Sequence, residues 1–533
     1  MAERGFLPNL RPLFDNLVRQ LSPVADRRDG APSAALAEPL LKSVVVPSAP
    51  AEGSAVPPSV VEDAAKAESA GLWGPTLTTC SATLGAGALS LPFAMSHLGM
   101  GLGLLLLALA ALATHYSITL LVSVMDATRL YSYEELTVHA FGRWVGVATE
   151  VAIISICFGS AIAYSVAVAD ILMPVLRLQA VKAAMAAAAI PAGLLSKQSV
   201  LIALWALVLL PLSLIEKLSA FEASSLFGVC SLVYLVLSVC VHAADSCAKD
   251  PEHTYTQLRA FTLTEHTPST VAILVFAFTC QVNVPSIYQD LQPRSGGNPA
   301  LQRGVSKHAE AEVRRSGRRM YAVSRRACAI CFVCYALIGA AGYANFPHSH
   351  EPNILSNYDI SQARNALMAP SFLAVALTVL AAYPLNIFPC RYTMDVILQR
   401  TRFSCWPAAA AAPQLPPQHQ PNRGVQDDAL VMTASPPGLA APMEPRRRVL
   451  LTLLITGLSL LVALYVPGIN VVFQLMGGTA SAFVCLVLPA ALALRQDVAE
   501  VRSTAGKVAC LTLGGTGVVV SVLSTASTIA GLL

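Results

Sequence analysis

The sequence predicts an all-α membrane protein with eleven transmembrane helices, arranged as a five-plus-five inverted repeat in which helices 1 and 6 are broken. Three observations lead to this fold class. Of the 533 residues, 55% are hydrophobic and only 12% are charged, and the mean hydropathy is +0.60, far from the averages of soluble domains. Eleven apolar windows are long enough to cross a bilayer, which takes about 20 residues. Two of these windows are interrupted by glycine, proline or polar residues.

The eleven windows divide into two sets of five and one extra helix. The first set covers residues 74–244, the second covers residues 269–494, and the extra helix covers residues 508–533. Because five is an odd number, the second set starts on the opposite face of the membrane, and the two sets are inverted relative to each other. In chain order the windows run from Gly74 to Leu98, Gly101 to Met125, Val145 to Leu176, Ser199 to Ile215, Leu218 to Ala244, Ser269 to Ile287, Ala327 to Phe346, Leu367 to Val396, Val449 to Val466, Ile469 to Leu494 and Val508 to Leu533.

The distribution of Lys and Arg predicts the orientation, because cytoplasmic loops collect basic residues near the ends of spans. With the N-terminus in the cytoplasm, 29 of the 35 basic residues fall on the inner side and six on the outer side. If the number of spans were wrong, the loops after the error would change sides, and the basic residues would be divided more evenly between the two faces. We therefore expect a cytoplasmic N-terminus and an extracellular or lumenal C-terminus. The membrane is either the plasma membrane or that of a vacuole-like or lysosome-like organelle.

Three polar segments lie outside the windows. Residues 1–72 are expected to form a disordered cytoplasmic tail. Residues 292–326 and 406–448 are expected to be cytoplasmic insertions of the same character, and regulatory contacts are possible in either. Within the first insertion, residues 314–319 form a basic cluster that we expect to set the topology and to touch anionic lipid, the alternative being a docking motif.

Two windows carry the features of a broken helix. Residues 83–92 of the first window read Thr-Leu-Gly-Ala-Gly-Ala-Leu-Ser-Leu-Pro, and residues 275–290 of the sixth window contain polar residues and Pro285. Hydrocarbon offers no hydrogen bonds, so unwound backbone is tolerated there only within protein or beside a wet cavity. Breaks at matching positions of two inverted halves point to a transporter's binding site. The alternative is that Pro285 is an ordinary kink and that Gly85 and Gly87 form a close helix-packing surface.

Several motifs, in this order, resemble those of the amino acid/auxin permease (AAAP) family, which includes the neutral amino acid transporters of systems A and N and the vacuolar amino acid transporters. The resemblance covers about residues 73–532. It implies eleven spans, a LeuT-like inverted-repeat fold and amino acid transport. The motifs are residues 85–94 (GAGALSLPFA), 157–164 (CFGSAIAY) with Asp170, 211–213 (PLS), 278–288 (FTCQVNVPSIY), 342–346 (GYANF), 383–391 (YPLNIFPCR) and 473–480 (FQLMGGTA).

The two breaks offer the chemistry that an amino acid zwitterion needs. Free amides at a half-helix N-terminus stabilise a carboxylate, and exposed carbonyls accept hydrogen bonds from an ammonium, so no charged side chain is required. We expect the carboxylate near the amides of Gly85, Ala86 and Gly87, with help from Thr83. The ammonium is expected near the carbonyls of Ala277, Phe278, Thr279 and Cys280.

Aromatic side chains complete the predicted site. The family resemblance implies that Tyr164 of the third window faces it. Phe276 and Phe278 are candidates to gate or line the pocket for the substrate side chain. The alternative is that these two phenylalanines face lipid or the core between helices.

The coupling ion is expected to be a proton or sodium. Sodium-coupled relatives tend to have Asn four positions before the first glycine, where this chain has Ser81, and Thr378 is an offset counterpart of their hydroxyl in span 8. Ionisable groups near span ends offer a proton relay if they face the cavity, and they are otherwise simple interface residues: His97, His115, Glu150 and Asp170. The candidates for ion coupling are Ser81, Thr378 and Asp170.

Other chemistry is not expected. Most of the 13 cysteines lie within spans, where cysteine acts as a small core residue. The spacing of Cys328, Cys331 and Cys334 lacks a fourth ligand for zinc. We expect no cofactor, no metal site and no nucleic-acid partner, and a monomer surrounded by membrane lipid. An enzyme would need an intramembrane nucleophile beside paired Asp or His, and the sequence shows none.

These observations predict a secondary active transporter that moves small neutral amino acids across a membrane by alternating access. The alternative is a transporter-like sensor or receptor, in which the cytoplasmic segments report an amino acid bound at the same site.

Overall fold

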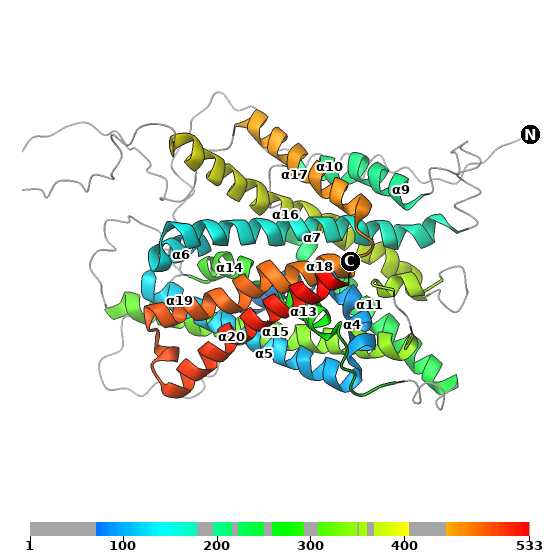
Figure 1. Cartoon of the computed structure of the whole chain (residues 1–533), viewed down its shortest axis with the longest axis horizontal. Coiled ribbons are helices and arrows are strands. Elements are labelled where there is room, and N and C mark those ends of the chain that lie inside the picture. The colour runs from blue at the N-terminus through cyan, green and yellow to red at the C-terminus, as the bar shows by residue number, and fades with distance from the viewer. Residues whose placement is uncertain are drawn as a thin grey trace, which may run out of the picture. The chain divides into compact units, whose positions relative to one another are not determined.

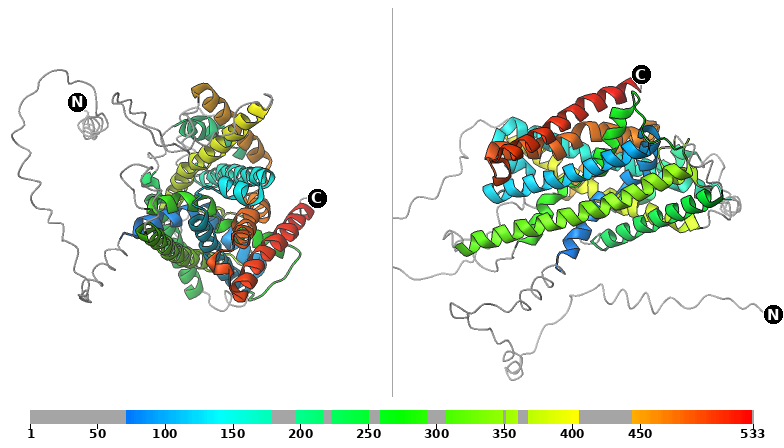
Figure 2. Two further views of the ribbon diagram at one scale, coloured as in Figure 1. Left: turned by 90° about the vertical axis from the view of Figure 1, so that its left-hand side faces the viewer. Right: turned by 90° about the horizontal axis from the view of Figure 1, so that it is seen from below.

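The computed structural model describes residues 71–178, 196–215, 222–249, 258–292, 307–348, 351–359, 367–404 and 444–531. Every regular element in these ranges is helical, and none of them contains a β-strand. The long helices run roughly along one common direction (Figures 1 and 2). The all-α class is therefore confirmed for this part of the chain. Residues 1–70 of the predicted tail, and residues 293–306 and 406–443 of the predicted insertions, lie outside the described ranges.

Nine helices of the described residues are long and apolar enough to cross a membrane, or ten if a bent pair near the N-terminus counts as a span. The protein is therefore a multi-pass membrane protein, and every regular element of its described residues is helical. The predicted window at residues 199–215 falls on a shorter apolar stretch, built from α9 (Lys197–Leu204), the π-helix η3 (Trp205–Leu209) and α10 (Leu210–Ser213). The nine are α5 (Met100–Thr128), α7 (Arg143–Leu176), α11 (Glu222–Lys249), α13 with α14 (Thr267–Leu291), α15 (Lys307–Asn345), α16 (Ala369–Ser404), α17 (Pro445–Tyr465), α18 through α19 (Ile469–Gln496) and α20 (Thr504–Ala530).

The first break lies where the sequence predicts it. After α3 (Trp73–Thr83), Gly85 is extended, with φ −115° and ψ −157°, and the chain resumes as the 3₁₀ helix η1 (Ala86–Ser90) and then α4 (Leu91–Leu98). The parts before and after the break are bent by 50°. Pro92 stands in the first turn of α4, where a missing N–H breaks no helical hydrogen bond, so it favours a new helix start at this point.

The second break interrupts the span that contains α13 (Thr267–Ala277). Residues 278–280 are not helical, and after the single turn η5 (Gln281–Asn283) the chain continues as α14 (Val284–Leu291). Pro285 stands in the first turn of α14. It therefore begins a new helix rather than kinking a continuous one, and the interpretation of Pro285 as an ordinary kink is wrong.

The structure corrects the prediction for the basic segment at residues 292–326. α15 begins at Lys307, well before the predicted window, so the second half of this segment is helical. Met320, Val323 and Ala327 recur at helical spacing and are buried. The search for apolar windows misses this part of the helix because only one of its faces is apolar. The same reason explains why the short helix α6 (Tyr133–Phe141) is absent from the predicted windows.

Glycine allows a very close contact between α13 and the π-helix η9 (Gly477–Ser481), which directly follows α18 (Ile469–Met476). A Cβ atom built on Gly477 would overlap the carbonyl oxygen of Ala272. By contrast, a Cβ atom built on Gly515 in α20 meets no atom within 4 Å. The first position therefore requires glycine, and the second does not.

We expect Gly477→Ala to destabilise the protein by about 1–3 kcal/mol, because the added methyl group must displace backbone rather than a flexible side chain. The thermal midpoint of the purified protein in detergent should fall by several degrees. Gly515→Ala is the matched control, and its midpoint should stay the same or rise slightly. Equal midpoints for the two variants would contradict the close contact between η9 and α13.

Candidate functional site

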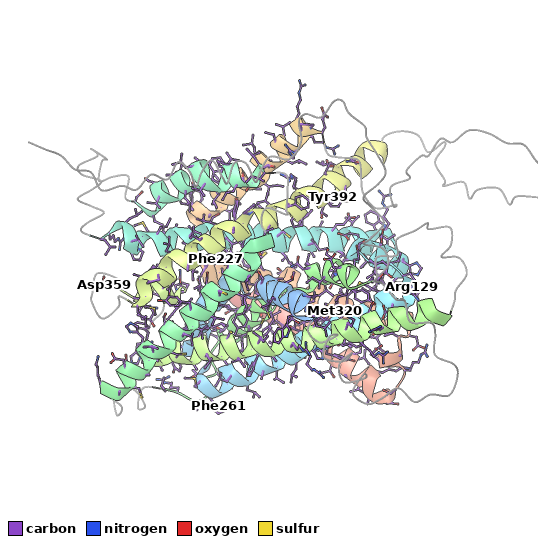
Figure 3. All side chains as sticks on the ribbon, turned by 180° about the vertical axis from the view of Figure 1, so that it is seen from behind. Arg129, Phe227, Phe261, Met320, Asp359 and Tyr392 are labelled. Atoms are coloured by element: carbon purple, nitrogen blue, oxygen red, sulfur yellow. The ribbon has the colours of Figure 1, made fainter. Side chains whose placement is uncertain are left out.

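A cavity of about 330 Å³ lies between the two breaks. That volume suits a small solute. Its walls come from four parts of the fold, namely α3 with η1, the second break with α14, α7, and α16. Seen from behind, α3 lies near the centre of the helices, in front of α15 with its labelled Met320 (Figure 3). The polar residues on the wall are Thr78, Ser81, Thr83, Ser160, Tyr164, Thr279, Asn283, Ser286, Asp290 and Asn386.

The cavity brings together most of the residues predicted to bind the substrate. Eight of the ten line it: Thr83, Gly85, Ala86, Gly87, Tyr164, Phe276, Ala277 and Thr279. The two halves of the predicted site, which are about 190 residues apart in the chain, therefore face one cavity.

Phe278 and Cys280 are not on the wall of this cavity. Their exposed fractions are 1% and 2%, and the ring of Phe278 meets the ring of Tyr335 edge-on, with the centroids 5.2 Å apart. The chain leaves the helix after Ala277, and the next side chain turns toward α15 instead of the cavity. The interpretation of Phe278 as a residue that lines the pocket is therefore wrong, whereas Phe276 does line it.

The two breaks touch each other and share a hydrogen-bond donor. A Cβ atom built on Gly87 would lie 3.1 Å from the Cα of Ala277. Between the two breaks, the hydroxyl of Tyr335 lies 2.6 Å from the carbonyl oxygen of Thr83 and 2.9 Å from that of Ala277. These carbonyls belong to the last residues of α3 and α13. One hydroxyl hydrogen thus serves the C-terminal ends of both half-helices, where the helix dipoles are negative.

The cavity extends from the breaks toward one face of the protein. Thr78 of α3 and Asp290 near the end of α14 line it, but none of the described residues of α4 does. It therefore reaches toward the face where α3 begins and α14 ends. Asp290, which is exposed, is the single charged residue among the described wall residues, so the walls around the breaks carry no formal charge.

A smaller cavity of about 70 Å³ adjoins the first and shares part of the wall formed by α3 and η1. Ser81 and Thr378, both predicted to take part in ion coupling, line this small cavity together with Ser231. The hydroxyl of Thr378 donates to the carbonyl of Ala374 at 2.8 Å, so its oxygen remains an acceptor. The structure thus places hydroxyl oxygens from α3, α11 and α16 around one small space.

The remaining ionisable candidates lie elsewhere. The carboxylate of Asp170 pairs with Nζ of Lys197 at 2.6 Å, and Asp170 lines neither cavity. His115 lies within hydrogen-bond distance of a serine of α15, and Glu150 is buried in α7; neither lines these cavities. His97 lines a third cavity, described below.

Sequence reasoning missed two polar side chains at the breaks. Asn386 of α16 lines the main cavity and donates to the carbonyl of Ala382 at 3.0 Å. The sequence does contain a signal for Asn386, because it is a polar amide inside an apolar span and lies within the motif at residues 383–391. Tyr335 has no such signal, since nothing in the pattern of an apolar helix shows which tyrosine faces a break in another helix.

The fold and this cavity define a class: a multi-pass membrane protein with a polar, solute-sized cavity at the interruptions of two helices. Residues 68–303 and 310–533 match the model of the family described as transmembrane amino acid transporter protein, and the chain belongs to that family. The resemblance found in the sequence motifs is thereby confirmed. The protein is a transmembrane amino acid transporter.

Three relatives are similar over most of the chain. The sodium-coupled neutral amino acid transporter 7 of Xenopus laevis is 24% identical over 435 residues, which cover 81% of this chain and 83% of the relative. The vacuolar amino acid transporter 6 of Saccharomyces cerevisiae is 23% identical, with 78% and 87% covered. The amino acid transporter AVT6E of Arabidopsis thaliana is 24% identical, with 80% and 76% covered. All three are named as transporters, which confirms the prediction that the protein is not an enzyme.

Among solved structures, a manganese transporter of Eremococcus coleocola, in complex with an aromatic bis-isothiourea substituted compound, is similar with a TM-score of 0.48 and 14% identity. The similarity covers 86% of this chain and 87% of that one. At this level it supports no argument about the present chain.

We expect Tyr335→Phe to lower amino acid uptake at least tenfold, because the carbonyls of Thr83 and Ala277 lose their shared donor. The carbonyl of Thr83 keeps the amide of Gly85 as a donor, whereas that of Ala277 loses its hydroxyl partner, and an unpaired buried group costs about 1–3 kcal/mol. Initial uptake rates into proteoliposomes, normalised to reconstituted protein, measure this. The control is Tyr383→Phe, which removes a 2.9 Å hydrogen bond to Ser459 from an equally buried tyrosine that lines neither cavity. Equal losses in the two variants would contradict a specific role of Tyr335 at the breaks.

Proposed function

We propose that the protein is a secondary active transporter that moves small neutral amino acids by alternating access around the cavity at the two breaks. The observation that carries this proposal is the cavity of about 330 Å³, lined by unwound backbone from both interrupted helices and without formal charge around the breaks. A neutral zwitterion fits such walls, since helix ends supply partial charges of both signs.

The two ends of the zwitterion have different partners in this proposal. The carboxylate lies near the amides of Gly85, Ala86 and Gly87. Ala86 and Gly87 begin a helical segment and have no earlier helical turn to donate to, whereas the amide of Gly85 already donates to the carbonyl of Thr83 at 2.9 Å. The ammonium lies near the carbonyls that follow α13. Ala277 already accepts from Tyr335, but a carbonyl oxygen has two lone pairs and accepts a second hydrogen bond.

Eleven spans in a LeuT-like inverted repeat are part of the same proposal. The helical stretch at residues 197–213 and the bent pair of α3 with η1 and α4 supply the two spans beyond the nine long helices. Interruptions in the first and sixth spans support an inverted pairing of the halves. The distribution of Lys and Arg supports a cytoplasmic N-terminus and an outer or lumenal C-terminus. On this orientation, the main cavity is open toward the cytoplasm.

The coupling ion in this proposal is a proton or sodium. Hydroxyl oxygens are ligands that a hard cation accepts, and Ser81 and Thr378 face one small cavity beside the main one. If sodium couples transport, Thr378→Val should raise the sodium concentration needed for half-maximal uptake about tenfold and leave uptake at saturating sodium close to that of the wild type. Uptake that depends on pH and not on sodium, in the wild type and the variant alike, would instead identify the proton and exclude a sodium site at Thr378.

The decisive experiment is uptake of a panel of labelled amino acids into proteoliposomes containing the full chain, at varied pH, with and without sodium. Accumulation of small neutral amino acids in response to an imposed ion gradient is the expected result. Binding of an amino acid without any flux would instead indicate a sensor. The same measurements show whether uptake requires a proton gradient or sodium.

We expect Gly87→Leu to abolish uptake while the protein remains in the membrane, because the new side chain occupies the contact between Gly87 and Ala277 and fills the cavity at the first break. Gly515→Leu is the matched control, since its side chain meets open space on α20. Uptake and the amount of folded protein are measured for both. Full activity of Gly87→Leu would contradict the assignment of the site to the breaks.

A further inference from the structure

A third cavity, of about 210 Å³, lies at the opposite end of the broken helices. We call it the outer cavity. His97 in the last turn of α4 and Thr270 in the first turns of α13 line it, together with Asn470 and Gln474 of α18. The C-terminal end of α20 closes its side. The main cavity reaches toward the start of α3, whereas the outer cavity lies where α4 ends and α13 begins, so the two cavities are on opposite sides of the breaks.

A pair of aromatic rings stands between these two cavities. Phe276, on the wall of the main cavity, stacks on Phe473 of α18, with ring centroids 4.7 Å apart and planes inclined by 21°. Ser269 and Phe276 are seven residues apart on α13, and Asn470 and Phe473 are three apart on α18, so each pair shares a helix face. The two faces that line the outer cavity therefore lead directly to the ring stack.

The surroundings of the stack indicate that it closes tightly and that it borders an irregular segment. Phe473 is fully buried, with an exposed fraction of 0%. Four residues after it, Gly477 begins the π-helix η9, and a Cβ atom built on Gly477 would lie 3.2 Å from the Cβ of Phe276. Turns of π-helix are rare in proteins, and those that do occur are frequently found at functional sites. The stack thus lies where α18 changes its hydrogen-bond pattern.

We propose that the stack of Phe276 on Phe473 is the closed gate between the two cavities, and that the outer cavity is a second binding site, which the amino acid occupies on its way to or from the main cavity. This inference rests on the proposed function, because it assigns a path to the same substrate. It goes beyond that function by naming the partner of Phe276 and a separate site with its own residues.

The chemistry of the outer cavity fits a zwitterion without net charge. Ser269 and Thr270 line this cavity, and their hydroxyls donate to the carbonyl of His266 at 2.9 and 2.8 Å, so their oxygens remain acceptors that suit an ammonium group. The carboxamides of Asn470 and Gln474, one turn apart on α18, carry N–H donors that suit a carboxylate. Among the described residues on this wall there is no Asp, Glu, Lys or Arg.

The gate is tested with Phe473→Ala. We expect accumulation of the amino acid against its gradient to fall at least tenfold, while its leak down the gradient in proteoliposomes becomes faster, because the barrier between the cavities is lost. Phe473→Leu, which keeps most of the packing volume, should show the same change to a smaller degree and serves if the alanine variant does not fold. The control is Phe372→Ala, a buried phenylalanine of α16 that lines none of the three cavities and should cause no leak. A tight, non-leaking Phe473→Ala protein would overturn the gate.

The second site is tested with the double variant Asn470→Leu and Gln474→Leu in proteoliposomes of uniform orientation. We expect the KM for amino acid entering from the side of the outer cavity to rise about tenfold, and the KM from the other side to stay the same. The control is Thr512→Leu, which changes an exposed hydroxyl on α20 that lines none of the three cavities. Equal changes from both sides, or none, overturn the second site. A wild-type protein without any flux overturns the proposed function itself, which separates the two failures.

Discussion

The requirement that backbone groups inside a membrane find hydrogen-bond partners shapes the centre of this protein. α3 and α13 both end in mid-span, and the partners that they lose are replaced nearby. The hydroxyl of Tyr335 lies between the last carbonyls of both half-helices, and the amide of Gly85 donates to the carbonyl of Thr83 at 2.9 Å. The breaks are therefore part of a packed structure in which each one depends on the other.

This mutual dependence explains why the two breaks form one site. Gly87 approaches Ala277 so closely that an added Cβ atom would lie 3.1 Å from the Cα of Ala277, and the hydroxyl of Tyr335 in α15 contacts both segments. The negative ends of two helix dipoles meet where the amino acid ammonium is proposed to bind, so a cation is stabilised without a carboxylate side chain. A substrate that carries both charges needs no fixed charge on the wall, and around the breaks the described wall has none.

The positions of the cavities relate this site to alternating access. The main cavity lies on one side of the breaks and the outer cavity on the other, with the rings of Phe276 and Phe473 between them. In the proposed mechanism, such an arrangement corresponds to a transporter that is closed on one side. α13 lines both cavities and packs against α18, so in the proposed transport cycle a movement of α13 against α18 would change the access to both cavities at once.

Much of the fold was predictable because its signals are local. A span shows itself by length and hydropathy, and a break by Gly85, Gly87 or Pro285, which act on their own backbone. The membrane class, the places of the long helices and both interruptions follow from such signals. The helical start of α15 was missed because an amphipathic segment carries a different pattern from a span.

The sequence by itself determined that the chain crosses a membrane many times and that two of its transmembrane helices are interrupted near their middle. Only the tertiary structure decided which side chains face the resulting space: Phe276 lines the cavity and Phe278 does not, Ser81 lies beside Thr378, and Tyr335 joins the breaks. The physical reason is that these helices are apolar on all sides, so hydrophobic periodicity gives no direction to a side chain. Packing against the neighbouring helices sets that direction.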